Sequence, residues 1–283
     1  GTSRLVINVG SGESADFTNI TASTFDSGTD TLTISGSTGG ETITGPNIAA
    51  TISGNAGNDN ITGGSAADII NGGNGNDTID GNDGADTLTG GSGDDIYIFN
   101  SNDVDTGETI VEASSGGTDT ISVITSTDFV NMSNASFDEI EAINFAGASQ
   151  TATFTGTQLT AETLILNETV AGTSRLVINV GSGETTTFTN ITAGTFSTTT
   201  DSLAINGTTG NETITGPNIA SAISGGAGND AISGGTEADI LSGGAGNDTL
   251  TGGDGTDSLT GGAGNDTYNF NTGDVDTGES ITE

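Results

Sequence analysis

The chain contains no cysteine, histidine, tryptophan or lysine, and its only basic residues are Arg4 and Arg175. The absence of cysteine excludes disulfides and thiol chemistry. The absence of histidine excludes an HExxH zinc site and a Ser-His catalytic pair, and cysteine and lysine nucleophiles are missing as well. We therefore expect no enzymatic site within these 283 residues. Lysine-based isopeptide cross-links are excluded too, so we expect chains to associate non-covalently.

The charge of the chain is almost all of one sign, with 38 acidic residues, two basic ones and a formal net charge of -36. Such a charge disfavours a compact state and makes nucleic acid and anionic membranes poor partners. Low hydrophobicity with high net charge is also typical of disordered chains. The protein is therefore either unfolded or neutralised from outside, and divalent cations are the first candidates. No run is long enough for a membrane helix, and no signal peptide is recognisable.

Residues 1–112 are repeated at 172–283, which sets a repeat length of 171. The two stretches align without gaps and are identical at about 77 positions. The motif DVDTGE occurs at 103 and again at 274. Because the chain starts inside one repeat and stops inside another, we expect it to be a fragment of a longer array.

A shorter, nine-residue repeat lies inside the long one. It runs for seven units in each copy, over 36–98 and 207–269. Position eight is always apolar: Ile43, Ile52, Ile61, Ile70, Ile79, Leu88 and Tyr97, then Ile214, Ile223, Ile232, Leu241, Leu250, Leu259 and Tyr268. Position six is acidic in six of the seven units of each copy: Glu41, Asp59, Asp68, Asp77, Asp86 and Asp95, then Glu212, Asp230, Asp239, Asp248, Asp257 and Asp266.

This nine-residue pattern predicts a parallel β-solenoid. Positions seven to nine, such as 78–80, form a three-residue strand whose middle side chain points inward. The preceding part of the unit forms a turn, in which glycine permits positive φ. Two units complete one coil of about 18 residues, and the position-eight side chains stack into a narrow core that no single unit could form alone. We expect both tyrosines to lie in that core.

The same geometry predicts calcium binding. Turns that are one coil apart lie about 4.8 Å from each other, so their carboxylates repel unless a cation lies between them. Calcium accepts six to eight oxygen ligands, including backbone carbonyls, whereas magnesium demands tight octahedral geometry and keeps its waters. We therefore predict calcium between stacked turns.

Residues 72–98 read GGNGNDTID, GNDGADTLT and GGSGDDIYI, which resembles the calcium-binding nonapeptide of the repeat-in-toxins (RTX, hemolysin-type) family. That family forms a parallel β-roll, and similar repeats occur in secreted bacterial toxins, proteases, lipases, giant adhesins and surface-layer proteins. The resemblance implies an all-β fold with several bound calcium ions. It also implies a secreted, extracellular protein at a bacterial cell surface, exported by a type I-like route.

The resemblance further implies a ligand set for each calcium ion. The lower turn gives the backbone carbonyls of nonapeptide positions two and four, the upper turn gives those of positions one and three, and each turn adds its aspartate. In the first copy these groups are Asn55, Gly57 and Asp59 with Gly72, Asn74 and Asp77; Gly64, Ala66 and Asp68 with Gly81, Asp83 and Asp86; and Gly73, Gly75 and Asp77 with Gly90, Ser92 and Asp95. In the second copy they are Gly226, Gly228 and Asp230 with Gly243, Ala245 and Asp248; Gly235, Glu237 and Asp239 with Gly252, Asp254 and Asp257; and Gly244, Gly246 and Asp248 with Gly261, Ala263 and Asp266. At least six calcium ions are expected.

Several turns depart from this pattern. Ala66 and Glu237 replace a glycine of positive φ, which weakens the turn but leaves its aspartate. Two units lack the carboxylate, so we expect no full site at Ala50 or Ser221. The glutamates at position six are poorer ligand candidates because they are one methylene longer: Glu41 and Glu212. The DVDTGE motif is either an additional calcium clasp or an acidic turn that caps the roll.

The remaining segments lack the nonapeptide. We divide the chain into 1–35 (calcium-poor β), 36–112 (β-roll), 113–206 (calcium-poor β) and 207–283 (β-roll). Runs such as LVINV, TATFT and FTNIT predict strands without helix in the calcium-poor segments. These strands form either further β-solenoid coils or a small β-sandwich.

Two functions fit the sequence. The first is a calcium-dependent structural repeat protein in a surface layer, a filament or an adhesin stalk, because near-identical modules build length. Such a protein is expected to associate head-to-tail with itself and to contact a cell surface or a neighbouring cell. The second is the calcium-dependent secretion and folding tail of a larger RTX enzyme or toxin. A sugar-binding adhesin tip is disfavoured, because tryptophan is absent and there are only two tyrosines.

Overall fold

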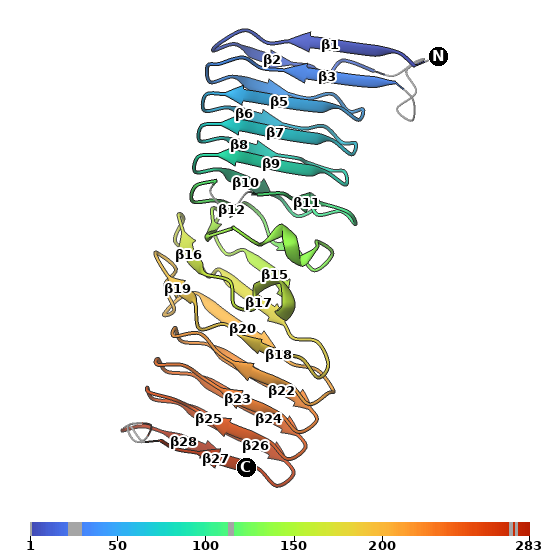
Figure 1. Ribbon diagram of the computed structural model, residues 1–283. Helices are drawn as coiled ribbons and strands as arrows, with labels where there is room; N and C mark the ends of the chain where they lie inside the picture. The colour runs from blue at the N-terminus through green and yellow to red at the C-terminus, as the bar shows by residue number, and fades with distance from the viewer. Residues whose placement is uncertain (1, 22–29, 113–115, 272–273, 275–276) are drawn as a thin grey trace. The chain divides into compact units, whose positions relative to one another are not determined.

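The computed structural model describes residues 2–21, 30–112, 116–271, 274 and 277–283. It separates into two compact units, Gly1–Asn144 and Phe145–Glu283. Within each unit the strands lie one above another, as the rungs of a ladder do (Figure 1). Every strand pairing described is parallel, as in β3 (Thr31–Ser35) with β5 (Thr51–Ala56). The predicted all-β parallel roll is confirmed.

The first unit has two sheets that face each other across the core. One contains, in spatial order, β1 (Arg4–Asn8), β3, β5, β7 (Ile69–Asn74), β9 (Thr87–Ser92) and β11 (Thr109–Ile110). The other contains β2 (Ser14–Asp16), β4 (Thr42–Thr44), β6 (Asn60–Thr62), β8 (Thr78–Asp80), β10 (Ile96–Phe99), β12 (Thr120–Val123) and β14 (Ala142–Phe145). The chain alternates between the sheets, so each pair of strands is one coil. The short strand β13 (Thr127–Asp128) follows β12 in the chain.

The second unit repeats this arrangement. One sheet contains β15 (Thr151–Thr155), β17 (Arg175–Asn179), β20 (Ser202–Asn206), β22 (Ala222–Ala227), β24 (Ile240–Ala245), β26 (Ser258–Ala263) and β28 (Ser280–Thr282). On the other face β16 (Leu164–Glu168) pairs with β19 (Ile191–Ala193), and a further sheet contains β18 (Thr185–Thr187), β21 (Thr213–Thr215), β23 (Ala231–Ser233), β25 (Thr249–Thr251) and β27 (Thr267–Asn269). No described helix is long and apolar enough to cross a membrane.

The register confirms the predicted coil in the nonapeptide blocks. Ile52 pairs with Ile70 and Ile61 with Ile79, one coil of 18 residues apart. The prediction of three-residue strands holds for one face only. Strands such as β8 are that short, but β5, β7 and β9 are twice as long, as are β22, β24 and β26. On this face the strand continues into the start of the next nonapeptide unit. The glycines there still pair in parallel with the equivalent glycines of the next coil, as Gly73 does with Gly91.

Position eight forms the core of the nonapeptide coils. Its isoleucine and leucine side chains are all buried. Tyr97 is also fully buried, but the prediction is wrong for Tyr268, which is only half-buried. The difference follows from the neighbours: β10 is covered by β12, whereas β27 is the outermost described strand of its sheet.

The segments between the nonapeptide blocks are solenoid coils, which resolves the alternative that the sequence left open. Arg4 pairs with Thr31 and Arg175 with Ser202, and the strands stay parallel and in register, as they would not in a sandwich. The residues of these two pairs are 27 residues apart, instead of the 18 of the nonapeptide coils. These coils bury aromatic side chains such as Phe154 and Phe188. A larger coil encloses a wider core, so these coils do not depend on one apolar residue per turn.

The expectation of strands without helix in 113–206 is wrong at two short places. A 3-10 turn, η1, covers Asn134–Ser136, and a single α-turn, α1, covers Gly156–Leu159. At α1 the backbone N–H of Thr155 donates to Oε1 of Gln158, which closes the first turn of the helix. This hydrogen bond is a local side-chain contact, which the alternating pattern used to predict strands does not reveal.

Candidate metal sites

The position-six carboxylates form a hydrogen-bonded ladder along one edge of each roll. The backbone N–H of Glu41 donates to Oδ1 of Asp59, that of Asp59 to Asp77, and that of Asp77 to Asp95, over 2.6, 2.8 and 2.7 Å. The opposite edge has the same ladder, in which Ala50 donates to Asp68 and Asp68 to Asp86. The second unit repeats both ladders through Asp230, Asp248, Asp266, Asp239 and Asp257. One oxygen of each carboxylate is thus fixed by the coil before it.

The second oxygen of most of these carboxylates is buried without a hydrogen-bond partner. This is true of Oδ2 in Asp59, Asp77, Asp86 and Asp95, and in Asp230, Asp248 and Asp266. The side chains of the first four are at most 2% exposed. A buried carboxylate oxygen without a hydrogen bond or an ion pair is costly, and a metal ion is one of the few groups that compensates it. The oxygens therefore fit a cation.

Backbone carbonyls converge on the same places. A Cβ atom added to Gly54 would overlap Oδ2 of Asp59 and lie 2.6 Å from the carbonyl oxygen of Gly72, the first residue of the next turn. A Cβ atom on Gly225 would overlap Oδ2 of Asp230 and lie 2.8 Å from the carbonyl oxygen of Gly243. Position one must therefore be glycine, because any side chain would fill a cradle of two oxygens.

The carbonyls of positions two and four also face the next turn. A Cβ atom on Gly73 would overlap the carbonyl oxygen of Asn55, and one on Gly75 would overlap that of Gly57. Gly73 and Gly75 have φ of 118° and 120°. The position-three carbonyl of Asn74 accepts the N–H of Gly57 at 2.8 Å, which uses one of its two lone pairs.

Burial shifts the titration of these carboxylates toward the neutral form. It raises the pKa of Asp77 and Asp95 to about 6, and that of Asp86 to about 7. It raises the pKa of Asp230 and Asp248 as well. The charged forms are disfavoured because water is excluded and neighbouring carboxylates repel them, and a bound cation would reverse both effects.

The turns with Ala66 and Glu237 differ from the neighbouring turns that contain Asp59 and Asp77, or Asp230 and Asp248. The residues of these two turns are all described, and none has a positive φ, not even Gly64 or Gly235. The backbone N–H of Gly64 donates to Oδ2 of Asp68 at 2.8 Å, and Gly235 does the same for Asp239 at 2.7 Å. Both oxygens of these aspartates therefore have partners. The expected site between Asp68 and Asp86 lacks a free oxygen from its lower turn, as does its counterpart in the second copy.

The position-six glutamates are also saturated with donors. Glu41 accepts N–H groups of Ser37 and Gly12 at 2.8 and 3.0 Å. Glu212 accepts those of Thr208 and Gly183 at 3.0 and 2.8 Å. Each extra methylene lets the carboxylate reach back to the preceding coil. Both oxygens of each glutamate therefore have hydrogen-bond partners.

The DVDTGE motif places Glu108 next in the ladder above Asp86. The N–H of Asp86 donates to Oε2 of Glu108 at 2.8 Å, while Oε1 is buried without a partner, and burial raises the pKa of Glu108 to about 9. Glu279 is equivalent: it accepts the N–H of Asp257 at 2.9 Å, and its Oε2 has no hydrogen-bond partner. Val275 and Asp276 of the second motif lie outside the described residues.

The ladder also continues past the nonapeptides, which the sequence pattern did not predict. The N–H of Asp95 donates to Oδ1 of Asp119 at 2.9 Å, and that of Asp119 to Oε2 of Glu141 at 2.6 Å. The signal that could have revealed Asp119 is the segment GTDTI at 117–121, which keeps the nonapeptide order of glycine, aspartate and apolar residue. It was hidden because the spacing from Asp95 is 24 residues.

Comparison with known families decides what kind of repeat this is. A family model described as the RTX calcium-binding nonapeptide repeat matches the chain four times, at residues 49–79, 71–103, 206–241 and 233–268. The chain carries RTX calcium-binding repeats. No curated protein and no solved structure was found to match it. The RTX repeats coincide with the turns that hold unpartnered aspartate oxygens, and RTX repeats of this kind bind calcium and are typical of secreted proteins.

Proposed function

We propose that this RTX chain is a segment of an extracellular structural protein that calcium causes to fold. Such a protein would form part of a surface layer, a filament or an adhesin stalk. The observation that carries the proposal is the recurrence of buried, unpartnered aspartate oxygens at equivalent positions in both copies, as in Asp59 and Asp230. The coils cannot close over these charges without a counter-ion. The nonapeptide blocks contain no basic residue that could replace one, since the only arginines are Arg4 and Arg175.

Six calcium ions are proposed from these carboxylates. Five lie where a turn with an unpartnered aspartate oxygen meets the carboxylate of the next coil: Asp59 with Asp77, Asp77 with Asp95, Asp86 with Glu108, Asp230 with Asp248, and Asp248 with Asp266. The sixth lies between Asp257 and Glu279, at the position equivalent to Asp86 and Glu108, and rests on Oε2 of Glu279. Sites based on Asp68 and Asp239 are left out because their second oxygens are occupied.

Head-to-tail self-association is supported by a comparison of two identical strands. Residues 4–8 and 175–179 both read RLVIN. The second strand, β17, pairs with β15 on one edge and β20 on the other, and its Leu176 is fully buried. Among the described strands the first, β1, pairs with β3 alone, and its Leu5 is 45% exposed. The free edge of β1 is thus suited to a strand that has a free edge of its own, such as β28, from another copy.

The experiment is sedimentation velocity and negative-stain electron microscopy of the purified chain in 5 mM calcium, in 5 mM magnesium and in excess chelator. The proposal expects folded chain and concentration-dependent oligomers in calcium alone. A matched control is Val6→Glu, which places a charge beside the strand edge without touching a nonapeptide turn. It should fold in calcium and remain monomeric. A wild-type chain that folds in calcium but stays monomeric at every concentration would contradict self-association and leave calcium-driven folding intact.

The alternative is a calcium-dependent secretion and folding tail of a larger RTX enzyme or toxin. It is favoured by the wide use of such repeats beside catalytic domains. Within this chain the lack of histidine, cysteine and lysine argues against catalysis. We therefore propose that the segment is not an enzyme. Assays of the chain for protease and lipase activity in calcium test this, and turnover that is abolished by chelator would overturn it.

A further inference from the structure

The last nonapeptide turn of the first unit meets a coil of unusual length. Ile96 pairs with Thr120, so this coil has 24 residues instead of 18. Even so, residues 116–119 return to the register of a nonapeptide turn. The N–H of Gly93 donates to the carbonyl of Gly116, and the N–H of Thr118 donates to Oδ1 of Asp94 at 2.9 Å. The upper half of a stacked pair of turns is therefore present outside the residues that match the family model.

Position one of this upper turn is occupied by Glu112 in place of glycine. Ile110 pairs with Leu88, and the same offset of 22 residues sets Glu112 against Gly90. The N–H of Gly90 donates to Oε1 of Glu112 at 2.9 Å, while Oε2 is buried without a partner. In the nonapeptide coils the N–H of a position-one glycine donates to a backbone carbonyl of the next coil, as Gly36 does to Ser53, so here a carboxylate has replaced a carbonyl.

Three carboxylates meet as a result. Ligand oxygens of Asp95, Glu112 and Asp119 all lie within 4.8 Å of one another. Asp95 is fully buried and its Oδ2 has no partner, and a Cβ atom on Gly90 would overlap that oxygen. Burial and the neighbouring charges of Asp119 and Asp95 raise the pKa of Glu112 to about 7. Two oxygens without hydrogen-bond partners, Oδ2 of Asp95 and Oε2 of Glu112, thus belong to one cluster of carboxylates.

We propose that Asp95, Glu112 and Asp119 form a further calcium site, with one more carboxylate than the proposed nonapeptide sites. The proposal rests on calcium binding by the RTX turns but adds two ligands that lie outside them. Because calcium affinity increases with the number of charged ligands in a site of similar rigidity, this site binds calcium more tightly than the two-carboxylate sites. It is filled first, and it fixes the end of the first nonapeptide block.

The two tyrosines make this site accessible to a specific measurement. The chain has no tryptophan, and the hydroxyl of Tyr97 accepts the N–H of Gly90, the same group that contacts Glu112. Tyr268 lies beside the equivalent turn of the second unit, where its hydroxyl accepts the N–H of Gly261 at 2.8 Å. In a Tyr268→Phe background, terbium luminescence excited through tyrosine therefore reports on the Asp95 turn.

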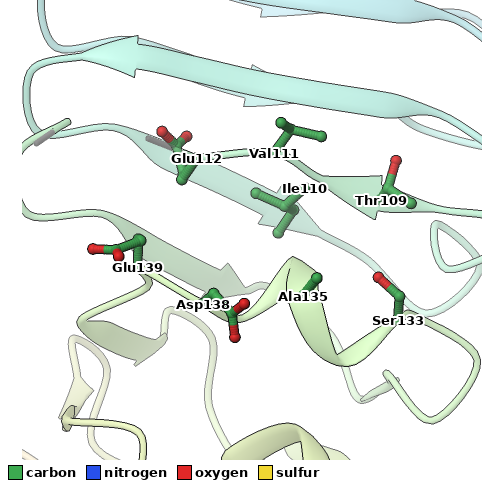
Figure 2. A pocket seen from close by; sticks show the side chains of 8 residues that line it. All are labelled: Thr109, Ile110, Val111, Glu112, Ser133, Ala135, Asp138 and Glu139. Carbon is green, nitrogen blue, oxygen red and sulfur yellow. The ribbon is translucent and has the colours of Figure 1, made fainter. Parts of the chain in front are cut away.

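The test compares Glu112→Gln with Asp138→Asn in that background by terbium titration, with calcium as competitor. Glutamine keeps the acceptor for Gly90 but removes the charge. Asp138 is exposed and lines the same groove, of about 470 Å³, that Glu112 borders. Figure 2 shows Glu112 and Asp138 on opposite sides of this groove, so Asp138→Asn is a charge-matched control.

We expect Glu112→Gln to raise the terbium concentration at half-saturation by about tenfold or more, and Asp138→Asn to leave it unchanged. Asp119→Asn must show the same loss of terbium affinity as Glu112→Gln. If Glu112→Gln fails to fold, which is judged by whether its circular dichroism spectrum in 10 mM calcium matches that of the parent chain, the result for Asp119→Asn decides the test. Equal titrations for all three variants would overturn the proposed site. Failure of the proposed function is distinct, because then the parent chain itself would not fold on addition of calcium.

Discussion

The backbone N–H of Asp59 donates to Oδ1 of Asp77 over 2.8 Å, one coil further along, while Oδ2 of Asp77 is buried without a partner. The same carboxylate therefore has two roles. One oxygen joins the coil to its neighbour through the backbone, and the other is available to a cation. This division explains why aspartate recurs at a fixed spacing along the roll: the first role sets the register, and the second offers an oxygen to calcium.

Asp77→Asn should reduce the number of bound calcium ions more than any other single change in the first block, because Asp77 belongs to two successive sites. Asparagine keeps an acceptor for the N–H of Asp59 and removes the charge. We expect about two fewer ions per chain by equilibrium dialysis and a lower melting temperature in calcium. The matched control is Asp68→Asn, whose two oxygens are both held by backbone N–H groups. It should lose about 1 kcal/mol of stability through one hydrogen bond but no ion; equal ion loss in both variants would contradict the assignment.

Gly54→Ala should weaken calcium binding without altering any carboxylate. Its Cβ atom would overlap Oδ2 of Asp59 and lie 2.6 Å from the carbonyl oxygen of Gly72, and neither the ladder nor the backbone can move away cheaply. Gly10→Ala is the control, because its Cβ atom would meet the flexible end of Glu13, at 2.9 Å. Calcium titration by circular dichroism should show a higher midpoint for Gly54→Ala alone. A wild-type midpoint for Gly54→Ala would mean that the cradle beside Gly54 is not a cation site.

The calcium-free chain should be more stable in acid than at neutral pH. Burial raises the folded-state pKa of Asp77 and Asp95 to about 6 and of Asp86 to about 7, above the ordinary value for aspartate. For a raised pKa, the stabilisation by protonation is complete below the unfolded-state pKa and is lost as the pH rises through the folded-state pKa. In chelator, β structure measured by circular dichroism should therefore increase as the pH falls from about 7 to about 4. A calcium-free chain that is equally unfolded throughout that range would contradict it.

The larger coils should keep structure at calcium levels that unfold the nonapeptide coils. Phe154, Leu176, Ile178 and Phe188 are all fully buried there, and the unpartnered aspartate oxygens of the described residues all lie in the nonapeptide coils instead. Hydrogen exchange during a chelator titration should show early loss of protection in β24 and β25 and later loss in β15 and β17. Simultaneous loss in all four strands would indicate that the second unit unfolds as a single cooperative body.

The nonapeptide part of the fold could be predicted from sequence because each nine-residue unit specifies the same half coil. An apolar residue every nine positions specifies both the inward direction and the coil of 18 residues that brings Ile61 onto Ile79. The turns were equally predictable wherever glycine occupies positions one, two and four. The prediction missed the longer strands of one face, since nothing in a single unit shows that the glycines at its start also pair across coils.

The coils outside the nonapeptides could not be predicted to the same depth. Paired residues there are between 22 and 28 residues apart. These spacings follow from how many bulky side chains must be enclosed, which depends on tertiary packing and not on a local period. The same irregular spacing concealed Glu112 and Asp119, which reach the ladder from different places in one long coil.

The Asp68 turn shows that one sequence pattern can be built with two backbone geometries. Its aspartate fits the nonapeptide, and the pattern therefore predicts a ligand. Its backbone has no positive φ, however, and this turns the N–H of Gly64 onto the oxygen that would otherwise be free. Asp68 thus has hydrogen-bond partners for both carboxylate oxygens, whereas Oδ2 of Asp59 and Oδ2 of Asp77 have none.

The central claim is that the unpartnered aspartate oxygens hold calcium and that the nonapeptide coils fold only when they do. The most direct test is to measure, on the same sample of the 283-residue chain, calcium bound per chain and the far-ultraviolet circular dichroism signal during one titration from chelator to millimolar calcium. We predict a disordered nonapeptide spectrum in chelator, a cooperative gain of β structure, and at least about six ions bound at its completion, with none of this in magnesium. An unchanged β spectrum in excess chelator, or full β structure with fewer than two ions per chain, would contradict the claim.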